Sequence, residues 1–229
     1  MKLDLSAYLV IGPENCSRPV EEVIAAAVDE GFTCVQIRSK VVGAREMISV
    51  LEKAAQVIRE LGKSDSVALL VNDRLDVALA AREAGIKVDG VHVGQSDIPV
   101  EVCRKFLGAD SIVGLSASTA EIISAADVSC VDYFGVGPLH ATDTKSDAGA
   151  ALSFEKISAL VKVSRLPLVV GGGVKAEDLP ALAATGVNGF FVVSAVAGAD
   201  NPRRAAHELV DTWILSVDNS AGKPYNLRG

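Results

Sequence analysis

Charged side chains lie at or beyond the C-terminal ends of several short apolar runs in this chain. Three of them are cations, Arg38, Lys40 and Lys145, and two are carboxylates, Asp73 and Asp97. Arginine and lysine are the residues that most often bind phosphate oxygens. Two aspartates without a histidine or cysteine partner suit a hard cation such as Mg²⁺, which takes one or two carboxylates plus substrate phosphates. These residue types therefore predict a site for a diphosphate and magnesium.

Each of these residues also has a purely structural explanation. Arg38 and Lys40 could equally form a solvated strand end. Asp73 and Asp97, each taken alone, are better explained as N-caps of the helices that follow them. His92 fits a hydrogen-bonded histidine of the sheet better than a metal ligand, because metal sites usually gather several histidines. The functional interpretation therefore depends on all these groups meeting at one edge of the fold.

Two segments nearer the C-terminus predict a second, separate phosphate site. Three consecutive glycines, 171–173, end one apolar run, and Val193 and Ser194 end the next. In barrels a monophosphate is held there by backbone N–H groups and the N-terminus of a short helix, and glycine lets the ligand approach closely. A tight turn would also explain the glycines without any ligand.

The elements that must position these groups repeat along the chain. Apolar, β-branched runs are each followed by an amphipathic stretch, and they span 7–12, 34–39, 68–73, 90–95, 111–117, 132–137, 168–173 and 189–196. Continuous apolar runs indicate strands buried on both faces, and hence parallel βα units. Eight units predict a closed (β/α)8 TIM barrel. The rival is an open doubly wound sheet, but the first run lacks the GxGxxG turn common in that fold.

Composition limits the remaining choices. We expect residues 1–217 to form one barrel domain, and 218–229 to be a C-terminal tail or a linker. The net charge of −7 provides no basic field for nucleic acid or anionic lipid. No apolar run approaches the ~20 residues that cross a membrane. The four cysteines are far apart and form no CxxC pair, and the N-terminus lacks the pattern of a signal peptide, so we expect a cytoplasmic protein.

Six segments, taken in order, resemble thiamin phosphate synthases over nearly the whole chain. They read QIRSK, VNDRLDVAL, GVHVGQSD, VGLSAS, GVGPLHATDTK and GGGV. Single segments are weakly specific, but GPxxxTxTK together with NDR and GQxD in this order is highly specific. The resemblance implies an enzyme that joins hydroxymethylpyrimidine diphosphate to hydroxyethylthiazole phosphate and releases pyrophosphate.

The resemblance also implies a role for each matching residue. Mg²⁺ would bind to Asp73 and Asp97. The diphosphate would bind to charged and amide side chains, namely Arg38, Lys40, Asn72 and Lys145. The pyrimidine would contact Gln36 and Ser116, and the thiazole phosphate would contact Thr142, Thr144, Gly172, Val193 and Ser194. The residues expected to act in catalysis are Arg38, Lys40, Ser116 and Lys145.

Three positions depart from the family pattern and bear on the contacts of the pyrimidine. Ser39 stands where an acid is common, His140 where an aromatic residue is common, and Ser118 near a common histidine. Two other functions stay open: a thiazole phosphate tautomerase, and a catalytically silent barrel that binds a phosphorylated precursor. The sequence is also compatible with a homo-oligomer and with fusion to another thiamin-pathway domain after the C-terminus.

Overall fold

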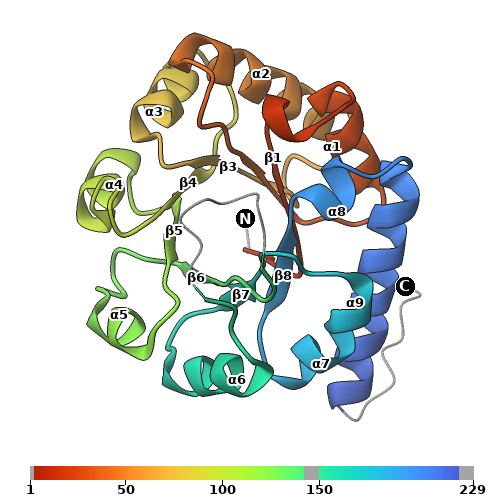
Figure 1. Cartoon of the computed structure of the whole chain (residues 1–229). Coiled ribbons are helices and arrows are strands. Elements are labelled where there is room, and N and C mark those ends of the chain that lie inside the picture. The colour runs from red at the N-terminus through yellow and green to blue at the C-terminus, as the bar shows by residue number, and fades with distance from the viewer. Residues whose placement is uncertain (1–2, 142–149, 222–229) are drawn as a thin grey trace.

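The apolar runs form parallel strands, as the sequence predicts, and the strands close into a barrel (Figure 1). The computed structural model describes residues 3–141 and 150–221. The strands are β1 (Ala7–Ile11), β2 (Cys34–Ile37), β3 (Ala68–Asn72), β4 (Gly90–Val93), β5 (Ile112–Ser116), β6 (Tyr133–Val136), β7 (Leu168–Val170) and β8 (Gly189–Val192). The β1–β8 pairing, with Ala7 opposite Phe190, completes the ring. The TIM-barrel prediction is therefore confirmed.

Helices cover the outside of the barrel between successive strands. They are α1 (Val20–Asp29), α2 (Ala44–Glu60), α3 (Leu75–Glu83), α4 (Val100–Leu107), α5 (Ala120–Ala125), α6 (Phe154–Val163), α7 (Leu179–Ala184), α8 (Ser194–Ala197) and α9 (Pro202–Ala221). Two short 3₁₀ turns, η1 (Pro13–Asn15) and η2 (Ala176–Asp178), follow β1 and β7. The last helix, α9, continues past residue 217 to Ala221, into the stretch expected to be a tail.

Alternate residues of each strand face two different layers of buried side chains. Leu9 and Ile11 of β1 point outwards into the core between the strands and the helices. Tyr8 and Val10, between them, belong to a second cluster that fills the barrel interior. This double burial explains why the strands read as continuous apolar runs rather than as alternating ones.

Two glycines make room for polar side chains inside the barrel. A Cβ atom on Gly114 of β5 would overlap the ring of Tyr133 and the imidazole of His92. A Cβ atom on Gly135 of β6 would lie 2.8 Å from the His92 Cε1 atom. Because real Cβ atoms do not approach other atoms so closely, these strands accept His92 and Tyr133 only with glycine at both positions.

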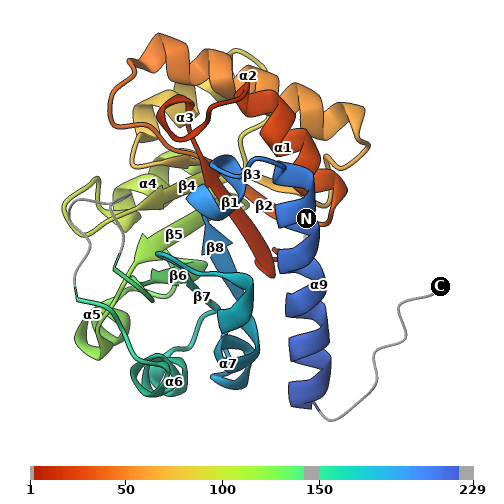
Figure 2. The same ribbon diagram turned by 45° about the vertical axis from the view of Figure 1, so that its right-hand side comes forward.

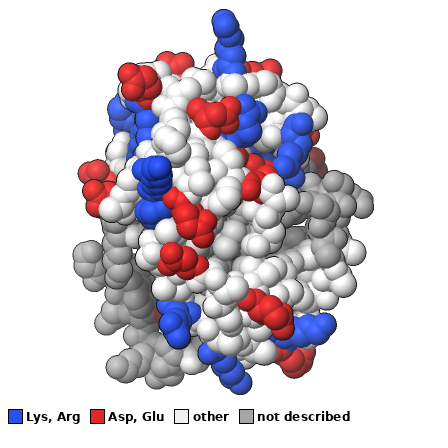
Figure 3. Space-filling model, turned by 90° about the vertical axis from the view of Figure 1, so that its left-hand side faces the viewer, with Lys and Arg blue, Asp and Glu red and all other residues white. Residues whose placement is uncertain are grey.

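Helix α9 and the charged surface lie on the outside of the barrel. Helix α9 runs along the outside of the barrel and packs against α7 and α1 (Figure 2). On the side that carries α4, acidic and basic side chains are interspersed (Figure 3). Within residues 3–141 and 150–221, no helix has both the length and the apolar character needed to cross a bilayer.

Candidate active site

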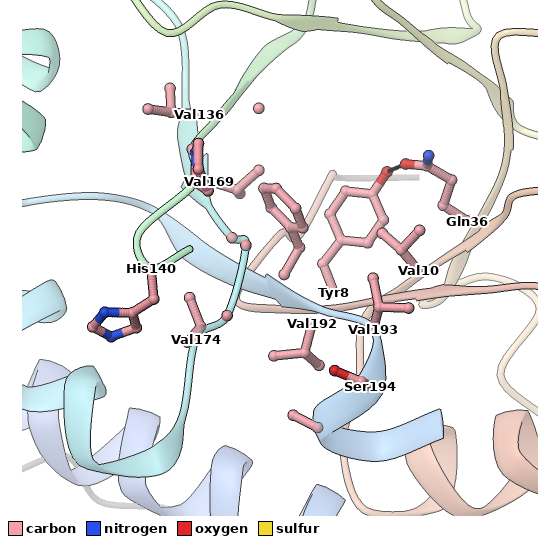
Figure 4. A pocket seen from close by; sticks show the side chains of 18 of the residues that line it. Tyr8, Val10, Gln36, Val136, His140, Val169, Val174, Val192, Val193 and Ser194 are labelled. Atoms are coloured by element: carbon pink, nitrogen blue, oxygen red, sulfur yellow. Dashed lines mark hydrogen bonds between the residues drawn. The ribbon is translucent and has the colours of Figure 1, made fainter. Parts of the chain in front are cut away.

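A cavity of about 960 Å³ opens at the C-terminal ends of the strands. Every strand of the barrel contributes to its wall or floor, from Tyr8 on β1 to Val192 on β8. Figure 4 shows Tyr8 and Gln36 on one side of the cavity, and Ser194 at the start of α8. In barrel enzymes this end of the strands carries the chemistry, so the cavity is the candidate active site.

Most of the site residues expected from the sequence meet here. Seven of them line the cavity, namely Gln36, Arg38, Asn72, Ser116, Gly172, Val193 and Ser194. Lys40, Asp73 and Asp97 lie beside it, on the loops after β2, β3 and β4. Thr142, Thr144 and Lys145 lie outside the described residues.

Asp73 has an unusual backbone and two partners that donate hydrogen bonds to one oxygen. Its φ angle is 60°, the left-handed region that few residues other than glycine adopt. Its Oδ2 atom accepts hydrogen bonds from Asn72 Nδ2 and from Lys40 Nζ, which lies 2.6 Å away. Helix α3 instead has Arg74 as its N-cap, without a side-chain capping bond, so the helix-cap interpretation of Asp73 is wrong.

Asp97 is not a helix cap either. Helix α4 begins after Pro99, and the Asp97 Oδ2 atom accepts a hydrogen bond of 2.8 Å from the amide of Gly94. Burial raises the pKa of the Asp97 carboxyl, and the neighbouring Asp73 carboxylate raises it further. Two neighbouring carboxylates of this kind form a suitable site for a divalent cation.

The donor set also fits magnesium better than zinc. Among residues 3–141 and 150–221, no group of three or more His, Cys, Asp or Glu side chains forms a metal cluster. A cation between Asp73 and Asp97 would therefore take its other ligands from water or from a bound phosphate, as Mg²⁺ commonly does.

A continuous chain of hydrogen-bonded polar side chains lies at the cavity floor, and we call it the polar chain; all of its members except Tyr133 line the cavity. Its members are Ser116, His92, Tyr133, Tyr8, Gln36 and Asn72. Its hydrogen bonds join His92 Nε2 to Ser116 Oγ (3.0 Å), His92 Nδ1 to Tyr133 Oη (2.9 Å) and Tyr133 Oη to Tyr8 Oη (2.8 Å). The Tyr8 hydroxyl donates to Gln36 Oε1, and Gln36 Nε2 donates to Asn72 Oδ1 at 2.6 Å. His92 is thus hydrogen-bonded inside the barrel, as the sequence predicts.

Sequence reasoning missed Tyr8 and Tyr133. Both side chains are almost completely buried, at 1% and 0% exposure. Burial raises the pKa of both phenols well above the ordinary value, so each keeps its proton. The available signal was a tyrosine within an aliphatic strand, because a buried hydroxyl needs a partner.

The glycines after β7 serve the packing of two loops. Gly172 and Gly173 have φ angles of 84° and 75°, which other residues rarely adopt. A Cβ atom on Gly172 would lie 2.6 Å from the Cβ of Pro138. Within the described part of the chain, no hydrogen bond engages the amide N–H groups of Gly172 or Gly173. The positive φ angles support the turn interpretation, and the two N–H groups have no acceptor among residues 3–141 and 150–221.

The three departures from the family pattern each make local hydrogen bonds. Ser39 is buried, and its hydroxyl accepts from two amides of its own loop. The Ser118 hydroxyl donates to the carbonyl of Gly137 at 2.8 Å. His140 Nε2 lies 2.9 Å from Asp178 Oδ1, which ties the loop after β6 to η2. All three substitutions therefore hold loops at the mouth of the barrel.

Comparison with known proteins gives consistent matches. A family model described as thiamine monophosphate synthase matches residues 7–196. The thiamine-phosphate synthase of Corynebacterium efficiens is 40% identical over 209 residues, which cover 90% of this chain and 94% of that protein. The thiamine-phosphate synthase of Moorella thermoacetica is 38% identical over 203 residues, which cover 88% of this chain and 92% of that protein.

Solved structures agree with the sequence relatives. A thiamine phosphate pyrophosphorylase from Pyrococcus furiosus superposes with a TM-score of 0.80 at 30% identity, covering 93% of this chain and 97% of that one. A 3-hexulose-6-phosphate synthase superposes with a TM-score of 0.65 at 17% identity, covering 91% of this chain and 99% of that one. The second likeness shows the shared barrel fold alone.

Proposed function

The chain belongs to the thiamine monophosphate synthase family, a family of transferases in thiamine biosynthesis, and from this premise we propose its substrates and mechanism. The first substrate is hydroxymethylpyrimidine diphosphate and the second is hydroxyethylthiazole phosphate. The products are thiamin phosphate and pyrophosphate. The separated, unpaired cysteines among the described residues support a cytoplasmic location for this reaction.

The observation that carries the proposal is the contrast between the floor of the cavity and its rim. The floor offers neutral hydrogen-bonding groups, Gln36 and Ser116, which suit an uncharged heterocycle. The rim offers Arg38 and Lys40, with Asp73 beside them. A planar polar ring joined to a diphosphate matches this division, because its ring would lie deep and its charge would lie near the mouth.

Bond changes at the first substrate need electrostatic help rather than a protein nucleophile. The bond between the pyrimidine methylene carbon and the bridging oxygen breaks, and its electron pair leaves with pyrophosphate. The aminopyrimidine ring delocalises the positive charge left on the methylene carbon. Arg38 and Lys40 stabilise the negative charge that develops on the leaving oxygen. Bound between Asp73 and Asp97, Mg²⁺ would add positive charge beside the same diphosphate.

The second step is an addition that transfers no proton. The lone pair of the thiazole nitrogen forms the new bond to the methylene carbon, and the ring becomes the cationic thiazolium. The N–H groups of Gly172 and Gly173, which have no acceptor among the described residues, support a site for the thiazole phosphate together with Ser194 at the start of α8. The protein would then contribute mainly by holding the nitrogen in line with the methylene carbon.

The Ser116–His92 pair needs a separate explanation, because serine and histidine also form nucleophilic sites. In such sites a carboxylate orients the second nitrogen of the histidine. Here the second nitrogen of His92 faces the neutral hydroxyl of Tyr133. The pair therefore fits a binding role better than acyl transfer, in agreement with a reaction that requires no nucleophile.

The proposal is tested by measuring pyrophosphate release from purified protein. We expect release only when the pyrimidine diphosphate, the thiazole phosphate and Mg²⁺ are all present. Omission of each component in turn provides the controls. Absence of pyrophosphate from the complete mixture would contradict the synthase function, and release without the thiazole phosphate would indicate a diphosphatase instead.

A further inference from the structure

We propose that Tyr8, Tyr133 and His92 are positioning residues that set the direction of every hydrogen bond in the polar chain. They fix Ser116 as an acceptor and Gln36 as a donor towards the cavity. The site thereby selects an aminopyrimidine over the corresponding oxopyrimidine. The inference rests on the proposed function in one respect: the ligand of the cavity floor is taken to be a pyrimidine.

The direction of the polar chain is set at its outer end. A carboxylate accepts hydrogen bonds and donates none, so the Asn72 atom that faces Asp73 must be the amide nitrogen. The other side-chain atom of Asn72 is then the carbonyl oxygen, which needs a donor. Gln36 Nε2 is that donor, at 2.6 Å. The carbonyl oxygen of Gln36 must therefore face Tyr8.

The two phenol hydroxyls also have defined directions, because each carries a single hydrogen. The Tyr8 hydroxyl has one hydrogen, and it donates that hydrogen to Gln36 Oε1. The bond of 2.8 Å between the two hydroxyls must then run from Tyr133 to Tyr8. Tyr133 has used its only hydrogen, so its oxygen can only accept from His92. Both phenols keep their protons because burial raises their pKa.

The result is a defined tautomer of His92 and a defined orientation of Ser116. His92 must carry its hydrogen on Nδ1, which donates to Tyr133 at 2.9 Å. In the neutral imidazole Nε2 is then an acceptor, and Ser116 donates to it at 3.0 Å. Ser116 has used its only hydrogen and presents lone pairs to the cavity. The second N–H of Gln36 Nε2 has no acceptor among the described residues.

This arrangement distinguishes two heterocycles of nearly the same shape. An aminopyrimidine offers an exocyclic N–H that Ser116 can accept and a ring nitrogen that can accept from Gln36. The oxopyrimidine reverses both groups, with a carbonyl oxygen and a ring N–H. A buried site whose donors and acceptors are fixed discriminates strongly, because the wrong ligand leaves polar groups unpaired.

The surroundings keep the polar chain from rearranging. Tyr8 and Tyr133 are buried to at least 99%, and the space that Tyr133 and His92 occupy exists because Gly114 and Gly135 carry no side chain. Inside a packed interior a partly satisfied polar chain is costly, so alternative directions that lose a bond are disfavoured.

The first test reads the tautomer directly in the wild-type protein. The chain has three histidines, so ¹⁵N NMR of the imidazole nitrogens gives few signals, and His92→Gln identifies those of His92. We expect a neutral ring with hydrogen on Nδ1 at neutral pH. Hydrogen on Nε2, or on both nitrogens, would overturn the proposal, because Ser116 would then face the cavity as a donor.

The second test measures selectivity through Tyr133→Phe. Without the phenol oxygen His92 can adopt either tautomer, and Ser116 can then donate as well as accept. We expect the wild type to bind the amino diphosphate about 100-fold more tightly than the oxo diphosphate, tenfold for each reversed hydrogen bond, and Tyr133→Phe to reduce this ratio to about tenfold or less. An unchanged ratio in the variant, or no preference in the wild type, would contradict the proposal.

A matched control separates selectivity from a general loss of stability. Thr185, directly after α7, has a buried hydroxyl that donates to the carbonyl of Leu182 in that helix, away from the polar chain, and Thr185→Val removes it. We expect this variant to keep the wild-type ratio. Turnover of the wild type with both substrates tests the proposed function separately: a wild type that forms thiamin phosphate while its ratio resists Tyr133→Phe would refute only the present inference.

Discussion

Substitution of Gly172 by alanine tests the packing between the loops after β6 and β7. Two separate costs follow from the structure. The backbone at this position has a φ angle of 84°, where a residue with a Cβ loses about 1–2 kcal/mol. The new Cβ would also lie 2.6 Å from the Cβ and 2.7 Å from the Cα of Pro138, and such overpacking costs about 1–3 kcal/mol.

Gly62 provides a matched control for the backbone term. It follows α2 with a φ angle of 68°, and an added Cβ would meet no atom within 4 Å. Gly62→Ala should therefore lower the free energy of unfolding by about 1 kcal/mol, after the opposing entropy gain in the unfolded chain. Gly172→Ala should lower it by about 2–4 kcal/mol, and the difference isolates the contact with Pro138.

The assay is urea unfolding of the two variants and the wild type, with steady-state kinetics on the same preparations. We expect unchanged slopes with urea and lower midpoints. We also expect Gly172→Ala to raise KM for the thiazole phosphate more than KM for the pyrimidine diphosphate. Equal losses of stability in the two variants would refute the packing described here, because only the backbone term would then be at work.

Four further outcomes follow. Without Mg²⁺, Asp97→Asn should become more stable relative to the wild type as pH rises above ~3.9, because the raised pKa of Asp97 makes its ionisation costly in the folded state. Urea unfolding at several pH values measures this, and parallel curves of unfolding free energy against pH for the two proteins would contradict it. Asp73→Asn should raise the Mg²⁺ concentration needed for half-maximal turnover; an unchanged requirement would remove Asp73 from the metal site. Lys145→Ala should slow turnover by about 2.7–4 kcal/mol in barrier, as for one donor to a developing oxyanion, and a wild-type rate would exclude this role. Gly114→Ala should displace Tyr133 and lower the unfolding free energy by about 1–3 kcal/mol, which denaturant titration would detect.

The fold could be predicted from the sequence because each strand and helix is marked by the residues of its own segment. Each strand is buried on both faces, so runs such as 68–73 are continuously apolar, and the helices between them carry ordinary stop signals. The edge of the barrel where Arg38, Asn72 and Ser116 meet follows from strand direction alone. Those residues could therefore be grouped without knowledge of any contact.

The hydrogen-bonding of the site could not be read in the same way. Tyr8 and Tyr133 are 125 residues apart, and nothing near either residue shows that their hydroxyls meet. For Asp73 and Asp97 the local sequence was misleading, because it favoured helix N-caps. The N-cap positions are instead Arg74 and Pro99, with the helices beginning at Leu75 and Val100, so both carboxylates bind other partners.

The central claim is that the enzyme breaks a carbon–oxygen bond and transfers the pyrimidine methylene group to nitrogen. The most direct measurement uses a pyrimidine diphosphate labelled with ¹⁸O at the bridging oxygen, with mass spectrometry of both products after turnover with the thiazole phosphate. We expect all of the label in pyrophosphate, and one thiamin phosphate formed for each pyrophosphate. Label retained in a pyrimidine alcohol would contradict the claim, because the bond to phosphorus would then be the one that breaks.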